Sequence, residues 1–350
     1  ASETAYDYFR SRAQQTWNGQ SKYMQGMTAL ALFRTGDNKT PGDILRSLKE
    51  TAIQNEEMGM YWKATQGWFW YQAPIETQAL LIEAFQEIGK DTKTVDDLKT
   101  WLLKNKQTTN WKTTKATAEA CYALLLQGSD WLSNTPVITI NLGHETIKSS
   151  DEKQEAGTGY FKKVFDYHHI SPRMGHIEVE VKSNNQQQSA TWGSVYWQYF
   201  ENIDKITTAE TPLQLTKKLF VEKNTDKGPV ISPVNDNDII KVGDKIKVRI
   251  ELRVDRDMEY VHMKDMRAAS FEPTNVLSRY KYQDGLGYYE STKDASTNFF
   301  FNYLRKGTYV FEYTLFAGQA GNFSNGITTI QCMYAPEFTA HSEGVRVTVE

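Results

Sequence analysis

The stretch SNTPVITINL, residues 133–142, separates two kinds of sequence in this chain. Before it, apolar residues recur at the three- and four-residue spacing of amphipathic helices, and after it they alternate with polar residues up to the C-terminus. A run of helices followed by a run of strands indicates separate cores rather than one interleaved sheet. We therefore predict a multidomain fold, with α-helical hairpins over residues 1–132 and two antiparallel β-sandwich units over residues 133–208 and 209–350.

Two segments of the helical part are similar to each other. ETQALLIEAF, residues 76–85, and TAEACYALLL, residues 117–126, start 41 residues apart, and a Trp-Lys pair precedes each of them. A period of this size is typical of helix-pair repeats, in which each pair buries its apolar face on the next. Because a closed toroid of six such pairs needs roughly twice this length, we expect residues 1–132 to form a partial α/α toroid.

The clearest strand pattern of the β part is KIKVRIELRV, residues 245–254, where an apolar face alternates with a charged one. One face of this strand is therefore expected to meet a core and the other to meet water. In the first β unit we predict strands at Val137–Leu142, Phe161–Asp166, His176–Lys182 and Trp192–Phe200. In the second unit we predict strands at Pro212–Glu222, Lys245–Val254, Tyr260–Asp265, Ala295–Tyr303, Thr308–Phe316, Gly326–Met333 and Val345–Glu350.

The charge, cysteine content and hydropathy of the sequence limit the kinds of partner and site that the chain can have. The formal net charge is −3 and the pI is near 6.2, so the sequence does not predict the basic face that nucleic-acid binding needs. Two cysteines, Cys121 and Cys332, lie on opposite sides of the helix-to-strand change, which is neither a disulfide framework nor a zinc site. No apolar run reaches the ~18 residues of a membrane span, and no signal-peptide pattern opens the chain. These residues leave the compartment open.

Motifs for catalysis, cofactors and metals are all incomplete in this sequence. Asp96-Asp97 has no third carboxylate close by, and His168-His169 would point to opposite faces of a strand. Asn235–Asp238 lacks the glycine and the distal glutamate of a calcium loop, so a turn is favoured. Asp284–Gly287 lies between predicted strands with no helix behind it to bind phosphate, which indicates a hairpin turn. We therefore predict that the chain is not an enzyme and holds no cofactor or metal.

The segment GNFSNGITTIQCMYAPE, residues 321–337, is similar to the last domain of bacterial α2-macroglobulin-like proteins, which are relatives of the complement proteins. In that family a glycine and a phenylalanine precede a strand that ends in Met-Tyr-x-Pro-Glu, here Met333–Glu337. DMRAASFEP at 265–273, YKYQDGLGYYE at 280–290 and the segment Phe299–Tyr313 fit the same domain.

This resemblance implies an assignment for each part of the chain. Residues 1–132 resemble the latter part of the thioester-domain toroid, residues 133–208 the strands that return into a CUB-like domain, and residues 209–350 the terminal macroglobulin domain. In this family a protease cuts a bait region, the molecule rearranges, and a Cys–Gln thioester captures the attacker. Tyr-Ala-Leu follows Cys121 and Met-Tyr-Ala follows Cys332, so neither cysteine fits the family's Cys-x-Glu-Gln motif. The resemblance thus implies a C-terminal fragment of a broad-spectrum protease inhibitor that contributes packing and no chemistry.

The resemblance also implies partners and a place in the cell. The partners are proteases, met through the full-length protein, and upstream macroglobulin domains of the same chain. The location is the cell envelope, periplasmic or extracellular, with a lipid anchor at the N-terminus as one option. Because the family's terminal domain shields the reactive site with aromatic side chains, we hypothesise that Tyr282, Tyr288 and Tyr289 make an inter-domain contact. Ordinary packing within the sheet is the alternative role for these tyrosines.

Two other classes of protein also combine helices with β-sandwiches. A polysaccharide lyase would need Tyr, His, Asn or Arg side chains in the toroid cleft, and no histidine precedes His144. A carbohydrate-binding module would use the aromatic run Trp68–Tyr71 as a stacking platform. Because this run directly precedes a helix start at Pro74, we favour packing between hairpins for it.

Overall fold

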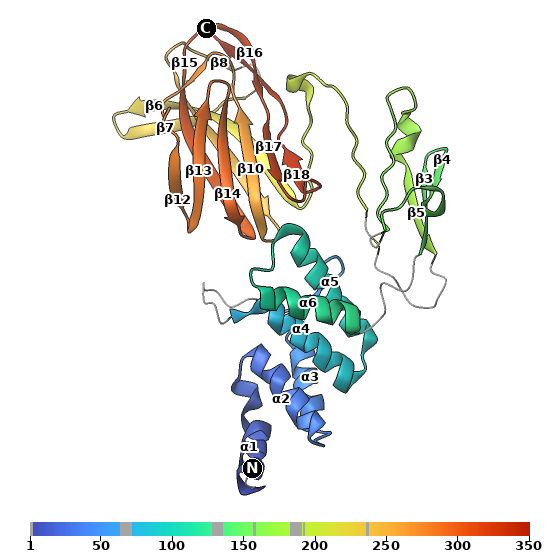
Figure 1. Cartoon of the computed structure of the whole chain (residues 1–350). Helices are drawn as coiled ribbons and strands as arrows, with labels where there is room; N and C mark the ends of the chain where they lie inside the picture. Colours follow the sequence, from blue (N-terminus) through green and yellow to red (C-terminus); the bar gives the residue numbers. More distant parts are fainter. Residues whose placement is uncertain are drawn as a thin grey trace. The chain divides into compact units, whose positions relative to one another are not determined.

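The computed structural model describes residues 3–63, 72–127, 136–156, 159–182, 191, 193–235 and 238–350. The chain divides into two compact units, residues 1–104 with 111–193, and residues 105–110 with 194–350. Helices occupy most of the first part of the chain, and strands, nearly all of them paired antiparallel, form the later sheets (Figure 1). This order confirms the predicted fold class of a helical part followed by β-sandwich structure.

The helical part contains short helices joined by tight loops. The helices are α1 (Glu3–Thr16), α2 (Lys22–Arg34), α3 (Thr40–Glu50), α4 (Pro74–Ala84), α5 (Thr92–Thr108) and α6 (Thr114–Leu126), with a short hairpin of β1 (Ile53–Asn55) and β2 (Gly59–Tyr61). Single turns at Trp17–Gly19 and Phe85–Gly89 extend α1 and α4. Local sequence sets several helix starts: the Ser21 hydroxyl accepts a hydrogen bond from the amide of Met24, and proline opens α4.

The two segments that resemble each other in sequence are found in α4 and α6, which pack against each other. Their apolar faces join those of α2, α3 and α5 in one core. Its buried members are Ala29, Leu30, Ile44, Leu45, Leu48, Met60, Ile75, Ala79, Leu81, Ile82, Ala84, Phe85, Val95, Leu98, Leu102, Ala116, Ala120 and Ala123. Helix α1 buries none of its residues, so this core lies among the later helices.

A small antiparallel sheet follows the helices, with strand order β4-β3-β5. Its strands are β3 (Val137–Leu142), β4 (Glu145–Lys148) and β5 (Ile177–Lys182). The predicted strands at 161–166 and 193–200 are absent from the described residues, and Trp192 lies outside them. Phe161 and Phe165 instead pack from a loop onto the small sheet's core. An alternating pattern forms a strand only where a neighbouring strand accepts its backbone hydrogen bonds, and among the described residues neither segment pairs with such a strand.

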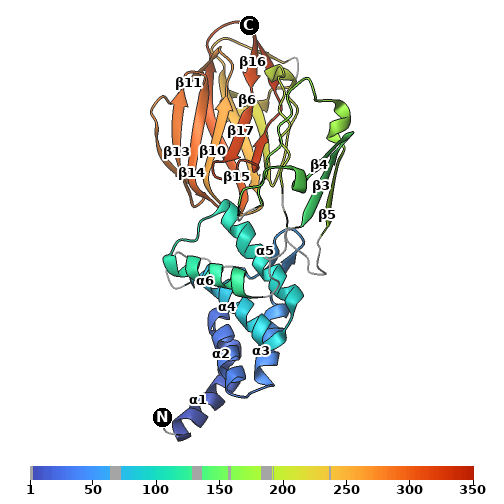
Figure 2. The same cartoon turned by 45° about the vertical axis from the view of Figure 1, so that its right-hand side comes forward.

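The C-terminal domain is a sandwich of two large sheets (Figure 2). One sheet has the order β12-β13-β14-β10-β17-β18 and the other β11-β15-β9-β6-β7, and β16-β19-β8 forms a third, smaller sheet. The strands are β6 (Leu213–Thr225), β7 (Gly228–Pro233), β8 (Ile239–Ile240), β9 (Lys245–Val254), β10 (Met258–Met266), β11 (Phe271–Pro273), β12 (Arg279–Gln283), β13 (Leu286–Lys293), β14 (Ser296–Leu304), β15 (Gly307–Ala317), β16 (Gly321–Gly326), β17 (Thr328–Cys332), β18 (Thr339–His341) and β19 (Val345–Val349).

Strand β9 shows why this domain folds as it does. Its apolar residues at alternate positions, from Ile246 to Val254, are all buried in the space between the two sheets. The charged residues between them lie on the other side, where Arg249 pairs with Glu312 of β15 at 2.6 Å. The predicted division of this strand into a core face and a water face is therefore confirmed.

Candidate contact surface of the C-terminal sandwich

Strand β13 sends its two adjacent tyrosines to opposite faces of the sheet, because successive side chains of a strand alternate. Tyr288 points inward and is only 5% exposed. Its ring contacts Phe299, Phe301 and Phe311 at centroid distances of 5.9, 5.7 and 5.4 Å. Burial raises the pKa of Tyr288 to about 12, with a smaller contribution from the nearby charge of Glu290. The structure thus places Tyr288 in the core of the sandwich.

Tyr289 belongs to an aromatic row on the outer face of the same sheet. The strand register places Tyr280, Tyr289, Phe300 and His262 side by side on four neighbouring strands. Successive ring centroids are 5.1, 6.5 and 4.7 Å apart, which is the range for favourable aromatic contacts. Tyr280 and Phe300 are exposed, and His262 is held by a 3.0 Å hydrogen-bond contact between its Nε2 and Oδ1 of Asn298.

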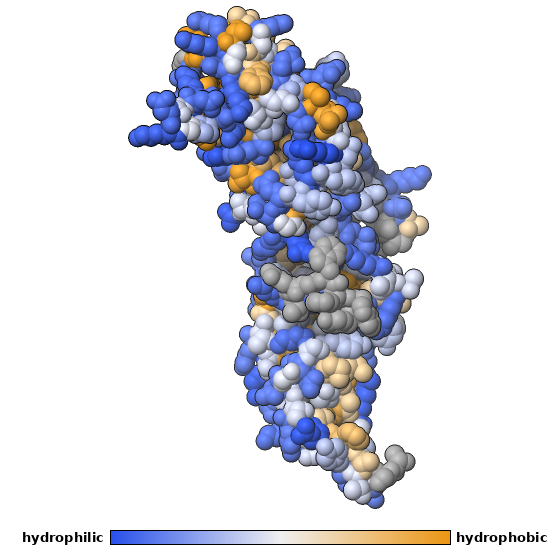
Figure 3. Space-filling view, turned by 90° about the vertical axis from the view of Figure 1, so that its left-hand side faces the viewer, coloured by the Kyte–Doolittle hydropathy of each residue, from blue (hydrophilic) through white to orange (hydrophobic). Residues whose placement is uncertain are grey.

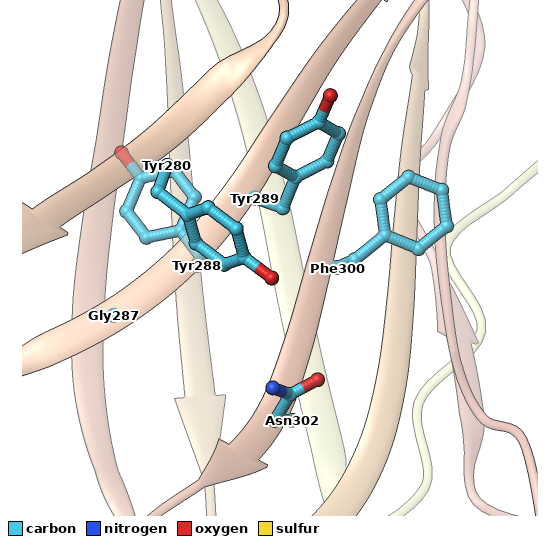
Figure 4. Close-up of a pocket in the computed structure, with 6 residues that line it drawn as sticks. All are labelled: Tyr280, Gly287, Tyr288, Tyr289, Phe300 and Asn302. Carbon is cyan, nitrogen blue, oxygen red and sulfur yellow. The ribbon is translucent and has the colours of Figure 1, made fainter.

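Tyr282 stands at the end of this surface and is 84% exposed. It lies opposite Gly287 in the β12–β13 hairpin, and a Cβ atom on that glycine would come within 2.9 Å of the Tyr282 ring. The glycine therefore lets the ring lie across the sheet. A shallow hollow of about 260 Å³ is lined by Tyr280, Gly287, Tyr288, Tyr289, Phe300 and Asn302 (Figure 4).

The hairpin that carries these residues has the turn that the sequence predicts. Asp284 and Gly285 both have positive φ, 50° and 76°, between the paired residues Gln283 and Leu286. Two central residues with positive φ define a type I′ turn, whose twist matches that of the flanking strands. The Asp-Gly pair therefore sets the register that sends Tyr282 and Tyr289 outward.

A second group of exposed apolar side chains was missed by the sequence prediction. Met333 and Tyr334 are both exposed, Tyr334 by 78%, and the Tyr334 ring meets that of Tyr260 at 5.3 Å. Tyr260 has a φ of +55°, a region that few non-glycine residues adopt, and its carbonyl accepts the amide of Met333 at 2.9 Å. We call Tyr260, Met333 and Tyr334 the end patch. The Met-Tyr-x-Pro-Glu motif was the available signal, because its two large side chains follow a buried cysteine.

Carboxylates beside the end patch hold residues 105–110 within the second unit. Oε1 of Glu337 accepts a hydrogen bond from Gln107 at 2.6 Å, and Oε2 of Glu259 accepts one from Asn110 at 2.8 Å. The Thr108 hydroxyl donates to the carbonyl of Asp257 at 2.9 Å. Glu259 and Thr108 are buried, so these hydrogen bonds are shielded from water.

The space-filling view shows the distribution of hydropathy over one face of the molecule. On the face drawn in Figure 3, hydrophilic residues cover most of the surface, and hydrophobic residues form small, separate patches. Soluble proteins rarely expose contiguous apolar patches without a role for them. The aromatic row and the end patch join exposed aromatic side chains through ring contacts, and we take them as the candidate contact surfaces of the sandwich.

The other residues singled out in the sequence are found in ordinary structural settings. Asp97 pairs with Lys93 at 2.8 Å along α5. Asn235 donates from its backbone and side chain to Asp238, and the two residues between them lie outside the described residues. His168 and His169 lie in a turn, and His169 contacts Asp166 at 2.8 Å. The run Trp68–Tyr71 lies outside the described residues.

The two cysteines differ in environment. Cys121 is exposed on α6, whereas Cys332 is buried in β17, and both are free thiols. Burial raises the pKa of the Cys332 thiol, which lies 3.5 Å from the carbonyl oxygen of Glu259. In the described residues no cluster of three or more His, Cys, Asp or Glu side chains could hold a metal ion. Among those same ranges, no helix combines the length and the apolar character that crossing a bilayer requires.

Comparison with known proteins gives one match to a family model. Residues 213–337 match the bacterial α2-macroglobulin MG10 domain. This range includes the Met333–Glu337 motif and both candidate surfaces. The match confirms, for the C-terminal sandwich, the resemblance to bacterial α2-macroglobulin-like proteins.

Solved structures of the same kind of protein cover nearly the whole chain at low similarity. They include a Salmonella α2-macroglobulin mutant (12% identity, TM-score 0.34) and trypsin-activated α2-macroglobulin from Escherichia coli (11% identity, TM-score 0.39). A third is the native E. coli protein from its MG7 domain to the C-terminus (11% identity, TM-score 0.33). Each alignment covers 97% of this chain and 21%, 22% and 52%, respectively, of the other chain. No curated protein sequence matches this chain.

Proposed function

We propose that this chain is the C-terminal part of an α2-macroglobulin-like, broad-spectrum protease-trapping inhibitor. Its role is to pack against other domains around the thioester region, and it performs no chemistry of its own. The observation that carries this proposal is the match of residues 213–337 to the bacterial MG10 domain, in a chain whose other parts leave apolar faces uncovered. We assign residues 1–132 to a partial toroid, 133–208 to a CUB-like unit and 209–350 to the terminal macroglobulin domain.

The helical part supports the partial toroid because, among the described residues, its first and last helices both expose apolar side chains. At the first end, α1 buries nothing and leaves Tyr8 and Phe9 exposed. At the last end, α6 leaves Tyr122 and Leu125 exposed. In a repeat array each helix pair is covered by the next, and an end without a cap exposes apolar surface. Further helix pairs on both sides would cover these faces.

The small sheet supports the CUB-like assignment in the same way. Ile177, Val179 and Val181 lie on one face of β5, and all three are exposed, Val179 by 60%. A sheet with one apolar face needs a second layer to bury it. We propose that strands from an upstream part of the same polypeptide supply that layer.

The aromatic surface supports a docking role for the sandwich. Tyr282 and Tyr289 present their rings outward, and Tyr288 underneath them fixes the strand by packing into the core. We propose that Tyr282 and Tyr289, together with the end patch, contact the domain that carries the thioester. Large aromatic groups at the centre of an interface typically contribute most of its binding energy.

The proposed partners and location follow from the family assignment. Proteases are the targets of the complete protein, and upstream macroglobulin domains of the same chain are the internal partners. The proposed location is the cell envelope, periplasmic or extracellular.

Trapping is tested by comparing this chain with the complete polypeptide that contains it. Each is incubated with trypsin, and hydrolysis of a large protein substrate and of a small chromogenic peptide is then measured. The complete polypeptide should block hydrolysis of the large substrate and spare the small one, because a trapped protease is sterically shielded. The 350-residue chain should affect neither. Turnover of a peptide or glycan by this chain, or no effect of the complete polypeptide on trypsin, would contradict the proposal.

Docking is tested in the complete polypeptide by hydrogen exchange of β12 and β13. The double variant Tyr282→Ser, Tyr289→Ser should increase exchange in these strands and in the thioester-bearing domain. Phe316→Ser is the matched control, since Phe316 is an exposed aromatic residue on β15 of the other large sheet. Equal exchange in the double variant and in the unmodified protein would refute the contact.

A further inference from the structure

A lysine and an aspartate meet in the interior of the sandwich. Lys217 comes from β6 of one large sheet and Asp265 from β10 of the other. Nζ of Lys217 lies 2.7 Å from Oδ1 of Asp265, and their side chains are 1% and 0% exposed. Full burial of both charges in a β-sandwich core is uncommon, because charged side chains lose their hydration there.

Two hydroxyl groups complete the surroundings of the Asp265 carboxyl group. The Thr328 hydroxyl donates to Oδ1 at 2.6 Å, and the Tyr313 hydroxyl donates to Oδ2. Nζ of Lys217 also donates to the carbonyl of Met266 at 2.5 Å. Burial, reinforced by the charge of Asp265, raises the pKa of Tyr313 well above its usual value, so its O–H remains a donor. The carboxyl group thus accepts hydrogen bonds from two hydroxyl groups and contacts the lysine Nζ.

This arrangement holds a potential nucleophile, Nζ of Lys217, beside a potential electrophile, Cγ of Asp265, away from bulk solvent. Amide formation needs the lysine as a free amine and the aspartate as a carboxylic acid, and the contact between Nζ and Oδ1 provides a direct path for that proton. Atoms held at contact distance in a fixed orientation react far faster than the same groups in solution. A donor aimed at a carboxyl oxygen also stabilises the negative charge that develops there during attack.

We propose that Lys217 and Asp265 condense to form an intramolecular amide cross-link between the two sheets. The ammonium group of Lys217 first gives a proton to Oδ1 of Asp265. The amine lone pair then attacks Cγ, the N–Cγ bond forms, and the Cγ–Oδ2 π electrons move onto Oδ2, where the Tyr313 hydroxyl stabilises them. A second proton passes from the nitrogen to Oδ1, the Cγ–Oδ1 bond breaks, and Oδ1 leaves as water. One ammonium and one carboxylate thus become one amide and one water molecule.

The cross-link is independent of the proposed protease-trapping role, because it concerns only the sandwich interior. It would join β6 to β10 covalently, so the two large sheets could not separate on unfolding. Such a cross-link would stabilise the fold mainly by lowering the conformational entropy of the unfolded chain, as a disulfide does.

Intact-mass spectrometry of the purified chain decides between the cross-link and a simple ion pair. If the proposal is correct, the chain is lighter than its sequence by the mass of one water molecule, and digestion yields a branched peptide that joins Lys217 to Asp265. The full sequence mass, with both residues recovered in unlinked peptides, would overturn it.

Two variants test the proposed reaction while keeping both reacting residues, Lys217 and Asp265. Tyr313→Phe removes the donor to Oδ2 and should slow the appearance of the lighter species in newly synthesised chain, followed by intact-mass spectrometry. Tyr309→Phe, on the same strand, is the control and should form the cross-link at the unmodified rate. Equal rates for the two variants would refute the role of Tyr313, while the mass of the unmodified chain tests the cross-link itself.

Discussion

Strands β9 and β5 have the same kind of sequence, but their apolar faces differ in burial. Both alternate an apolar residue with a charged one, yet Ile250 of β9 is 0% exposed and Ile177 of β5 is 39% exposed. The difference is that a second sheet faces β9, whereas the apolar face of β5 is only partly covered at one end of its sheet. Alternation therefore predicts which face of a strand is apolar. Whether that face is buried depends on a second layer from another part of the protein.

The same contrast separates the two faces of strand β13. Tyr288 is surrounded by phenylalanines between the sheets, and Tyr289 lies on the outer face. In our account, the uncovered faces of α1, α6, β5 and the outer face of β13 are docking surfaces of a longer protein. The following predictions test whether covered and uncovered positions behave as differently as their surroundings suggest.

The largest effect is expected for Tyr288→Ser. Truncating a large buried aromatic side chain leaves a cavity and should lower the free energy of unfolding of the sandwich by about 3–5 kcal/mol. Tyr289→Ser, one residue away on the outer face, should change it by less than about 1 kcal/mol. Chemical denaturation monitored by hydrogen exchange of the sandwich strands measures both. Equal losses would show that the outer tyrosine is also part of the core.

A matched isoleucine pair compares the two sheets directly. Ile250→Ala should destabilise the sandwich by about 2–5 kcal/mol, because it removes a fully buried side chain. Ile177→Ala should destabilise the small sheet by less than about 1 kcal/mol in this chain, since the side chain is already partly in water. The readout is the denaturant concentration at which each sheet unfolds, measured by hydrogen exchange of proteolytic peptides from that sheet. In the complete polypeptide the cost of Ile177→Ala should rise, and an unchanged cost would argue against a covering layer.

An acid-sensitive attachment is predicted for α1, which lacks buried residues. Asp37 accepts a 2.7 Å hydrogen bond from Gln14 of α1, and this bond, with those from Lys39 and Thr40, lowers its pKa from 3.8 to about 2. Because the folded pKa is the lower one, Asp37 stabilises the attachment above pH 3.8, and this contribution disappears as the pH falls toward 2. Hydrogen exchange of Glu3–Thr16 should therefore rise across that range.

Asp37→Asn serves as the control for this pH effect. The variant should expose α1 already at neutral pH and should lose the pH dependence between 4 and 2, since no carboxyl group is left to titrate. A profile that matches the unmodified chain would show that another group controls α1.

The smallest effect is expected for Gly287→Ala on the outer face of β13. The added methyl group would meet the Tyr282 ring, which is free to rotate into solvent. We expect a stability change of less than about 1 kcal/mol, together with a shift of the Tyr282 ring resonances in NMR spectra. Unshifted resonances would show that the ring does not lie over the glycine.

Much of the fold was predictable because it depends on local sequence. The helix-to-strand change at 133–142, the two faces of β9 and the Asp284-Gly285 turn all follow from spacing and turn chemistry. In the part of the chain that the structure describes, the strands expected at Phe161–Asp166 and Trp192–Phe200 are not seen, because a strand also needs a hydrogen-bonding neighbour. Periodicity carries no information about that neighbour.

The candidate site was predictable only in part. The sequence located the tyrosine-rich hairpin, and strict alternation along Leu286–Lys293 already implies that Tyr288 and Tyr289 cannot share one face. The end patch was not predicted, because its exposure depends on the unusual backbone at Tyr260 and on the turn after β17. The buried pair of Lys217 and Asp265 was also missed, since it joins strands from two different sheets.

The most direct test of the central claim is hydrogen exchange of this chain alone compared with the complete polypeptide that contains it. Our account predicts that peptides covering Glu3–Thr16, Thr114–Leu126 and Ile177–Lys182 exchange more slowly in the complete polypeptide, because neighbouring segments cover their apolar faces. Peptides from Lys245–Val254 should exchange alike in both, because that core is already closed. Equal exchange of the uncovered segments in the two proteins would contradict the claim that they are docking surfaces.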